Sequence, residues 1–205
     1  MTEEIKQNEQ DWLYGSRVKE HFFNPKNFLD IDKDKDINFN GMGIIGNPTC
    51  GDMMKFWILV DPDETIKECR WLTYGCASAI ASSSVFSEMV KRKKIDQALK
   101  ITPQDIIKEL GGLPTHKIHC SVLCDKAFRQ AANDYFRNTN QYERVVPFGE
   151  VIDPITKTTK QEIEALFHDG VNTLEKIQQR TKAGVGNREI EDRINSLLEE
   201  LKDDK

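Results

Sequence analysis

The chain has 205 residues, 38% hydrophobic and 31% charged, which is typical of a globular protein with one sizeable domain, alone or with a small appendage. Its net charge of −5 argues against a nucleic-acid-binding surface. No apolar run approaches the roughly 20 residues of a membrane span, and the first residues lack the apolar segment of a secretory signal. Five cysteines without such a signal indicate a reducing compartment, so we expect a cytoplasmic protein that binds neither nucleic acid nor membrane.

The first part of the chain predicts a helix followed by a β-hairpin. Apolar residues four positions apart between residues 11 and 23 indicate an amphipathic helix, which Asn24-Pro25 ends. Residues 30–40 are predicted to form a charged, solvated loop. Alternating residues then predict a strand over 53–60 and its return strand over 66–74.

The middle of the chain predicts three helices. Helical spacing begins after Gly75-Cys76 and continues to the basic run 91–94. The pair Thr102-Pro103 is typical of a helix start, because proline is favoured at the first helical position, and this helix closes at Gly111-Gly112. Residues 121–138 predict a long helix.

The rest of the chain predicts a second, smaller unit. We expect a first domain over residues 11–138, a linker over 139–150 and a small all-helical domain over 151–205. The helices expected in this last part cover 160–169, 173–182 and 188–202, separated by glycines.

Three cysteines have neighbours that suit a metal site. Cys50 is followed two residues later by Asp52, and Cys120 directly follows His119. Cys76 lies where a predicted strand enters a helix, and Cys120 just before a predicted helix start, where helix N-termini stabilise thiolates. Intervals of 26 and 44 residues are too long for a zinc knuckle, so the ligands can meet only in a folded domain. Thiolates with a carboxylate and an imidazole suit zinc or an iron–sulfur unit.

Other interpretations of the same residues remain open at this point. One is a zinc-binding regulatory or sulfur-acceptor protein that uses the same ligands. Another is a hydrolase with Cys120 as its nucleophile, although the adjacent His119 cannot easily act as its base and no oxyanion motif is evident. Cys69 and Cys124 are expected to be buried residues without a chemical role.

Five segments match one known family in the same order along the chain: Tyr14–Val18, Asn24–Asn27, Cys50–Asp52, Gly75–Ser84 and Leu113–Ser121. Through them, residues 12–138 resemble the iron–sulfur cluster assembly scaffolds of the IscU/NifU type. The resemblance implies an α+β fold, in which a small, mostly antiparallel sheet is packed by helices on one side.

The resemblance also implies the roles of the site residues. Cys50, Cys76 and Cys120 would hold a transient [2Fe–2S] cluster, with Asp52 and His119 as adjustable ligands. Cys120 matches the acceptor of persulfide sulfur from a cysteine desulfurase. The implied protein is a scaffold and not an enzyme: it accepts iron and sulfur, builds a labile cluster and passes it to apo-proteins. Zinc is a further metal that purified scaffolds of this kind can carry.

Partners follow from the same resemblance. They are a cysteine desulfurase of the IscS/NifS type and apo iron–sulfur client proteins, with ferredoxin and chaperones as further partners. Tyr14 matches a tyrosine linked to dimerisation of the cluster-building form, which implies a homodimer. Residues 113–117 read Leu-Pro-Thr-His-Lys, whereas the branch served by a dedicated Hsp70 pair has Leu-Pro-Pro-Val-Lys. The interval from Cys76 to Cys120 leaves no room for the insertion of the zinc-dependent SufU branch.

A second resemblance covers the C-terminal part. Residues 162–186 are similar to the helical, ferredoxin-like (BFD-type) domain of NifU, which holds a permanent cluster through a CxC and a CxxC pair. The corresponding positions here are Pro147, Gly149, Asn187 and Ile190, and none is a cysteine. We therefore expect a BFD-like helical domain that folds without a cluster.

Overall fold

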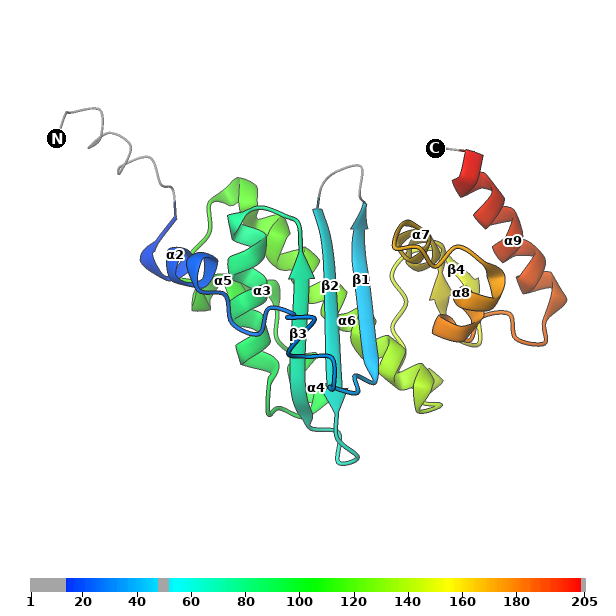
Figure 1. Ribbon diagram of the computed structural model, residues 1–205, viewed down its shortest axis with the longest axis horizontal. Coiled ribbons are helices and arrows are strands. Elements are labelled where there is room, and N and C mark those ends of the chain that lie inside the picture. The colour runs from blue at the N-terminus through cyan, green and yellow to red at the C-terminus, as the bar shows by residue number, and fades with distance from the viewer. Residues whose placement is uncertain (1–13, 48–51, 204–205) are drawn as a thin grey trace.

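The structure is a computed structural model that describes residues 14–47 and 52–203 (Figure 1). In chain order the elements are α2 (Ser16–Phe23), β1 (Gly41–Asn47), β2 (Asp52–Val60), β3 (Ile66–Thr73), α3 (Ala77–Val90), α4 (Ile95–Ala98), α5 (Pro103–Glu109), α6 (Ile118–Asn138), β4 (Val151–Asp153), β5 (Thr158–Thr159), α7 (Lys160–His168), α8 (Leu174–Thr181) and α9 (Arg188–Asp203). No helix in these ranges is long and apolar enough to cross a membrane.

The predicted hairpin is confirmed as β2 and β3, the centre and one edge of an antiparallel sheet of order β1-β2-β3. Helices α3 and α6 cover one face of this sheet (Figure 1). The core between them contains Phe56, Phe86 and Phe128, whose rings meet edge to face with centroids 5.1–6.4 Å apart. The α+β fold expected from the resemblance is therefore confirmed.

Strand β1 was not expected from the sequence, because three of its seven residues are glycines and glycine disfavours strands. The structure explains two of them by the close approach of α6. A Cβ atom at Gly43 would lie 2.1 Å from the carbonyl oxygen of Ala127, and one at Gly41 would lie 2.5 Å from that of Ala131. The glycines therefore let the α6 backbone lie directly against β1.

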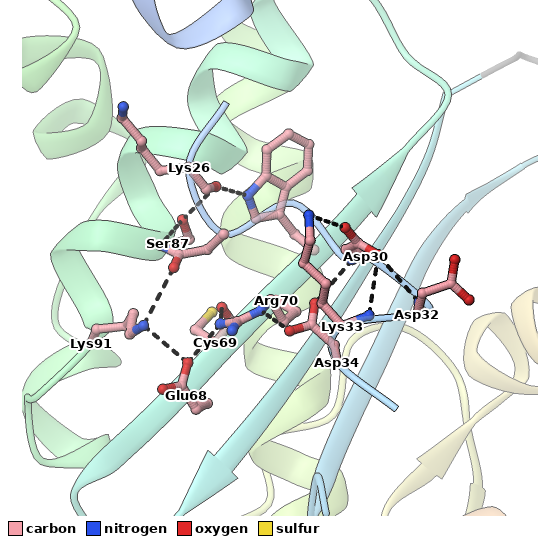
Figure 2. A network of polar contacts seen from close by, with 12 residues as sticks. Lys26, Asp30, Asp32, Lys33, Asp34, Glu68, Cys69, Arg70, Ser87 and Lys91 are labelled. Carbon is pink, nitrogen blue, oxygen red and sulfur yellow. Dashed lines mark hydrogen bonds and ion pairs between the residues drawn. The ribbon is translucent and has the colours of Figure 1, made fainter. Parts of the chain in front are cut away.

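The outer edge of β3 is covered by the segment 26–34, whose last five residues, 30–34, begin the predicted charged loop (Figure 2). Asp34 is buried and accepts a hydrogen bond from Arg70 Nε at 2.9 Å. The Arg70 side chain also donates to Glu68, which pairs in turn with Lys91. The prediction of a fully solvated loop is wrong at Asp34, because the largely buried guanidinium of Arg70 on β3 requires a counter-charge.

The C-terminal part contains the three predicted helices α7, α8 and α9, which bury an apolar seam that includes Ile163, Ile177 and Ile194. The prediction of a helical C-terminal part is confirmed by these helices, but the part is not all helical, because the short hairpin β4–β5 precedes α7. Two features explain the hairpin. Four of the five residues in its strands are β-branched, and the Asp153 carboxylate accepts the backbone N–H of Ile155 at 2.8 Å to close the turn.

The C-terminal part packs against the free edge of β1 (Figure 1). Ile44 of β1 belongs to the same apolar cluster as the helices α7–α9. Arg137 of α6 forms a buried, two-pronged ion pair with Glu162 of α7, at 2.7 and 2.9 Å. Lys55 of β2 pairs with Asp169, just after α7. These contacts join the two parts on both faces of the sheet.

The segment 139–150, predicted to be a linker, packs on the first core. Val145 is buried, and Arg144 donates to Glu64 and Asp96 while its guanidinium stacks 4.2 Å from the centre of the Phe136 ring. The division of the chain into two domains stays a prediction.

Candidate metal site

One end of the sheet gathers the elements that carry the predicted ligands. Strand β1 ends at Asn47 opposite Asp52, the first residue of β2. Strand β3 ends at the same level, because Thr73 pairs with Met54. Helix α6 runs past β1 so that Ala127 lies beside Gly43, and its first turn therefore lies towards this same end.

Cys76 stands at the N-cap of α3 and is partly exposed. The turn before it is fixed by Thr73, whose hydroxyl donates to the Met53 carbonyl at 2.7 Å and accepts the Gly75 N–H at 3.1 Å. Burial alone would raise the pKa of the Cys76 thiol. The backbone N–H groups at the start of α3, the neighbouring Cys120 and the charge of Lys117 together bring this pKa below its ordinary value.

Cys120 lies inside the first turn of α6. The sequence predicted a position just before the helix, and that prediction is wrong. The helix begins earlier because a 3-10 turn, Thr115–Lys117, follows Pro114 and leads without interruption into Ile118. This early start turns Cys120 inward, where its exposed fraction is 0%. Its Sγ atom lies 3.4 Å from Cys76 Sγ, so the structure brings these two predicted ligands into direct contact.

The other predicted ligands are placed less completely. His119 is exposed next to Cys120 in the first turn of α6. The backbone of Asp52 opens β2, and Cys50 lies outside the described residues. Within the described ranges, no three histidine, cysteine, aspartate or glutamate side chains lie close enough to hold a metal ion. The described residues thus supply two adjacent thiols, and the full ligand set stays a prediction.

Tyr14 lies beside the same helix start. Its hydroxyl accepts a hydrogen bond from Ser78 Oγ at 3.0 Å, two residues after Cys76, and its ring packs against the main core. Tyr74, which is 74% exposed, directly follows β3 and stands two residues before Cys76. The role of Tyr14 in dimerisation stays a prediction.

The remaining cysteines are placed as expected for residues without a chemical role. Cys69 and Cys124 have exposed fractions of 0%. Burial raises the pKa of Cys69 to about 12 and that of Cys124 well above its ordinary value. Both thiols therefore stay protonated and unreactive, in contrast to Cys76.

Sequence reasoning missed Thr73 and Lys117 as supporting residues. Thr73 fixes the turn that presents Cys76, and Lys117 contributes positive charge to its thiol. The available signal was position alone: each stands two or three residues from a predicted ligand.

Comparisons with known proteins find similarity to proteins of the IscU and NifU type. The family model described as NifU-like N terminal domain matches residues 13–142. The iron-sulfur cluster assembly scaffold protein IscU 1 of Archaeoglobus fulgidus is 43% identical over 137 residues, which are 67% of this chain and 86% of that protein. The nitrogen fixation protein NifU of Azotobacter chroococcum mcd 1 is 34% identical over 194 residues, which cover 92% of this chain and 60% of that protein.

One solved structure found by the comparison is that of a protein from Fervidobacterium islandicum AW-1, described as an iron-sulfur cluster assembly scaffold protein for the SUF system. It is 20% identical, has a TM-score of 0.47, and covers 58% of this chain and 96% of that chain.

Proposed function

The chain belongs to the family of NifU-like N-terminal domains, and from this we propose that it is a scaffold for iron–sulfur cluster assembly and not an enzyme. It accepts iron and sulfur, builds a labile cluster and transfers that cluster to apo-proteins. The observation that carries the proposal is the contact between Cys76 and Cys120, 3.4 Å apart at the starts of two helices. Two adjacent soft ligands at positive helix ends suit an anionic iron–sulfur unit.

We further propose that the cluster is a [2Fe–2S] centre held by Cys50, Cys76 and Cys120, with Asp52 and His119 as exchangeable ligands. Two features support this set: His119 and Cys120 share the first turn of α6, and Asp52 begins β2 at the same end of the sheet. Thiolates bind iron firmly, while a carboxylate or imidazole exchanges more easily, which suits a cluster that must leave. Zinc would compete for the same donors.

The partners of this scaffold would be a cysteine desulfurase that supplies sulfur and apo-proteins that receive the cluster. Ferredoxin and chaperones are further candidates, and Tyr14 and Tyr74 would contribute to a homodimer contact near the site. The exposed position of Tyr74 and the partial exposure of Tyr14 and Cys76 support a docking surface at this end.

We propose that the C-terminal part derives from the BFD-like domain of NifU and now serves to stabilise the scaffold. The NifU alignment covers 92% of the chain and therefore extends well beyond residue 142, where the family match ends. All five cysteines lie at or before Cys124, so no thiolate is available there to hold a cluster. The shared apolar cluster around Ile44 and the Arg137–Glu162 pair support the stabilising role.

The test is anaerobic reconstitution of the full chain with a cysteine desulfurase, cysteine and ferrous iron, followed by addition of an apo-ferredoxin. We expect visible charge-transfer absorption that moves to the ferredoxin. The variant Cys120→Ser should lose persulfide uptake and cluster formation, whereas the matched variant Cys69→Ser should retain both. A chain that took up zinc but gave no chromophore with iron and sulfur would overturn the proposal.

A further inference from the structure

The contact between Cys76 and Cys120 joins two thiols that are 44 residues apart in sequence. Their Sγ atoms are 3.4 Å apart, and a disulfide bond is about 2.04 Å long, so a movement of about 1.4 Å would join them. Thiol–disulfide exchange requires one sulfur to reach another in this way. The two residues are therefore placed for chemistry with each other and not only for binding a metal.

A scaffold that receives sulfur from a desulfurase also needs a source of electrons to reduce that sulfur. This inference therefore rests on the proposed function. The transferred sulfur arrives as a persulfide, in which the outer sulfur is at the oxidation level of elemental sulfur. The bridging atoms of an iron–sulfur cluster are sulfide. Each transferred sulfur must therefore gain two electrons before it can enter a cluster.

We propose that the Cys76–Cys120 pair supplies these two electrons and releases the sulfur as hydrosulfide. The Cys76 thiolate attacks Sγ of a persulfide on Cys120, and a bond forms between the two Sγ atoms. The bond between Cys120 Sγ and the outer sulfur breaks, and its electron pair leaves with that sulfur as HS⁻, which keeps its proton. The two cysteine sulfurs are oxidised to a disulfide, and the outer sulfur is reduced to sulfide.

The step is symmetric with respect to the two residues. A persulfide on the partly exposed Cys76, attacked by the Cys120 thiolate, gives the same disulfide and the same hydrosulfide. An external dithiol reductant then cleaves the disulfide and restores both thiols as ligands. Two such cycles provide the two bridging sulfides of one [2Fe–2S] unit.

The surroundings of Cys76 and Cys120 favour this reaction more than the surroundings of the other described cysteines do. Cys76 is the N-cap of α3 and Cys120 lies in the first turn of α6, so hydrosulfide departs between the positive ends of two helices. Cys69 lies within β3 and Cys124 lies one turn further along α6 than Cys120, so neither stands at a helix start. The reaction is thus assigned to one pair out of the four described thiols.

The experiment separates sulfide release from sulfur delivery. Persulfide is installed on the full chain with inorganic polysulfide, the excess is removed, and the protein is incubated anaerobically without reductant. We expect one hydrosulfide for each disulfide that links the peptides of Cys76 and Cys120, at a rate independent of protein concentration. In Cys76→Ser the persulfide should persist, and sulfide release should fall at least tenfold. In Cys120→Ser, loaded on Cys76, release should fall equally.

Two results would overturn the inference: release from Cys76→Ser at the wild-type rate, or movement of the outer sulfur to Cys76 without any hydrosulfide. The matched variants Cys69→Ser and Cys124→Ser should behave as the wild type, and circular dichroism confirms that each variant is folded. Persulfide uptake from a cysteine desulfurase is measured separately. Its failure would count against the proposed function, while the release measurement on polysulfide-loaded protein would still decide the role of the pair.

Discussion

Removing one partner of the buried ion pair between α6 and α7 should strongly destabilise the protein. The Arg137 side chain is 1% exposed and that of Glu162 is 9% exposed. Glu162 accepts two hydrogen bonds from the guanidinium, whose Nε donates to the Thr156 carbonyl at 2.9 Å. The substitution Glu162→Gln removes the carboxylate that pairs with this buried charge, and breaking such a pair costs about 3–5 kcal/mol. This is a large share of the roughly 5–15 kcal/mol that stabilises a typical domain.

Thermal and urea unfolding at pH 7, followed by circular dichroism, measure this cost. At about 2–4 °C per kcal/mol for a chain of this size, the melting temperature should fall by about 6–20 °C if unfolding is a single transition. The double variant Arg137→Met with Glu162→Leu should recover most of the loss, because neither charge is then left buried. As a control, Glu199→Gln removes the partner of Lys202 in an exposed pair and should cost less than about 1 kcal/mol.

Two outcomes would refute this reasoning. One is a Glu162→Gln variant that loses less than about 1 kcal/mol, which would mean that solvent reaches Arg137 despite its burial. The other is a double variant less stable than Glu162→Gln, which would mean that the pair contributes net stability over apolar residues of similar size.

Three further predictions address the site and its support. The variant Asp52→Ala should keep its cluster longer and transfer it more slowly, because a hard, exchangeable ligand is removed; faster loss would contradict this role. The variant Gly43→Ala should lose at least about 2 kcal/mol of unfolding free energy, because the added methyl group forces β1 away from α6. The control Gly15→Ala, where a Cβ meets nothing within 4 Å, should tolerate the methyl group. Equal unfolding midpoints for the two variants would contradict this prediction. Burial raises the pKa of Asp134 from 3.8 to about 6, so the folded protein binds a proton that the unfolded chain has released, and its contribution to stability falls as the pH rises from about 4 to 6. Asp134→Asn, which keeps an acceptor for the Met42 N–H, should remove this slope and gain up to about 3 kcal/mol at pH 7; an unchanged slope would refute it.

The sequence predicted the elements whose pattern of apolar residues or whose terminal residues follow from their secondary structure. Alternation identified β2 and β3, and Thr102-Pro103 marked the start of α5, where Thr102 and Asp105 form a capping box. Strand β1 escaped prediction because its glycines are required by contact with α6, and nothing within residues 41–47 reveals that contact. The hairpin β4–β5 escaped because its strands are too short to show alternation.

In the site, too, some features could be predicted from the sequence, and others depend on tertiary contacts that the sequence does not reveal locally. The resemblance implied that Cys76 and Cys120 would share a site, and the structure brings them into contact. Their separation and the burial of Cys120 depend on how α6 crosses the sheet, which the local pattern does not encode. The Arg137–Glu162 pair had no sequence signal, because its members belong to helices predicted in separate domains.

The edge of β1 stays uncovered during part of the synthesis of the chain, because the helices that pack on it are made later. Ile44 leaves the ribosome 119 residues before Ile163, one of the helical residues that share its apolar cluster. At about 5–20 residues per second, the edge of β1 waits roughly 6–24 s before α7 exists to cover it. During this interval the nascent scaffold presents an uncovered strand, the kind of edge that pairs with other chains. A ribosome-bound chain arrested before residue 150 should therefore bind a β-strand peptide that the finished protein excludes.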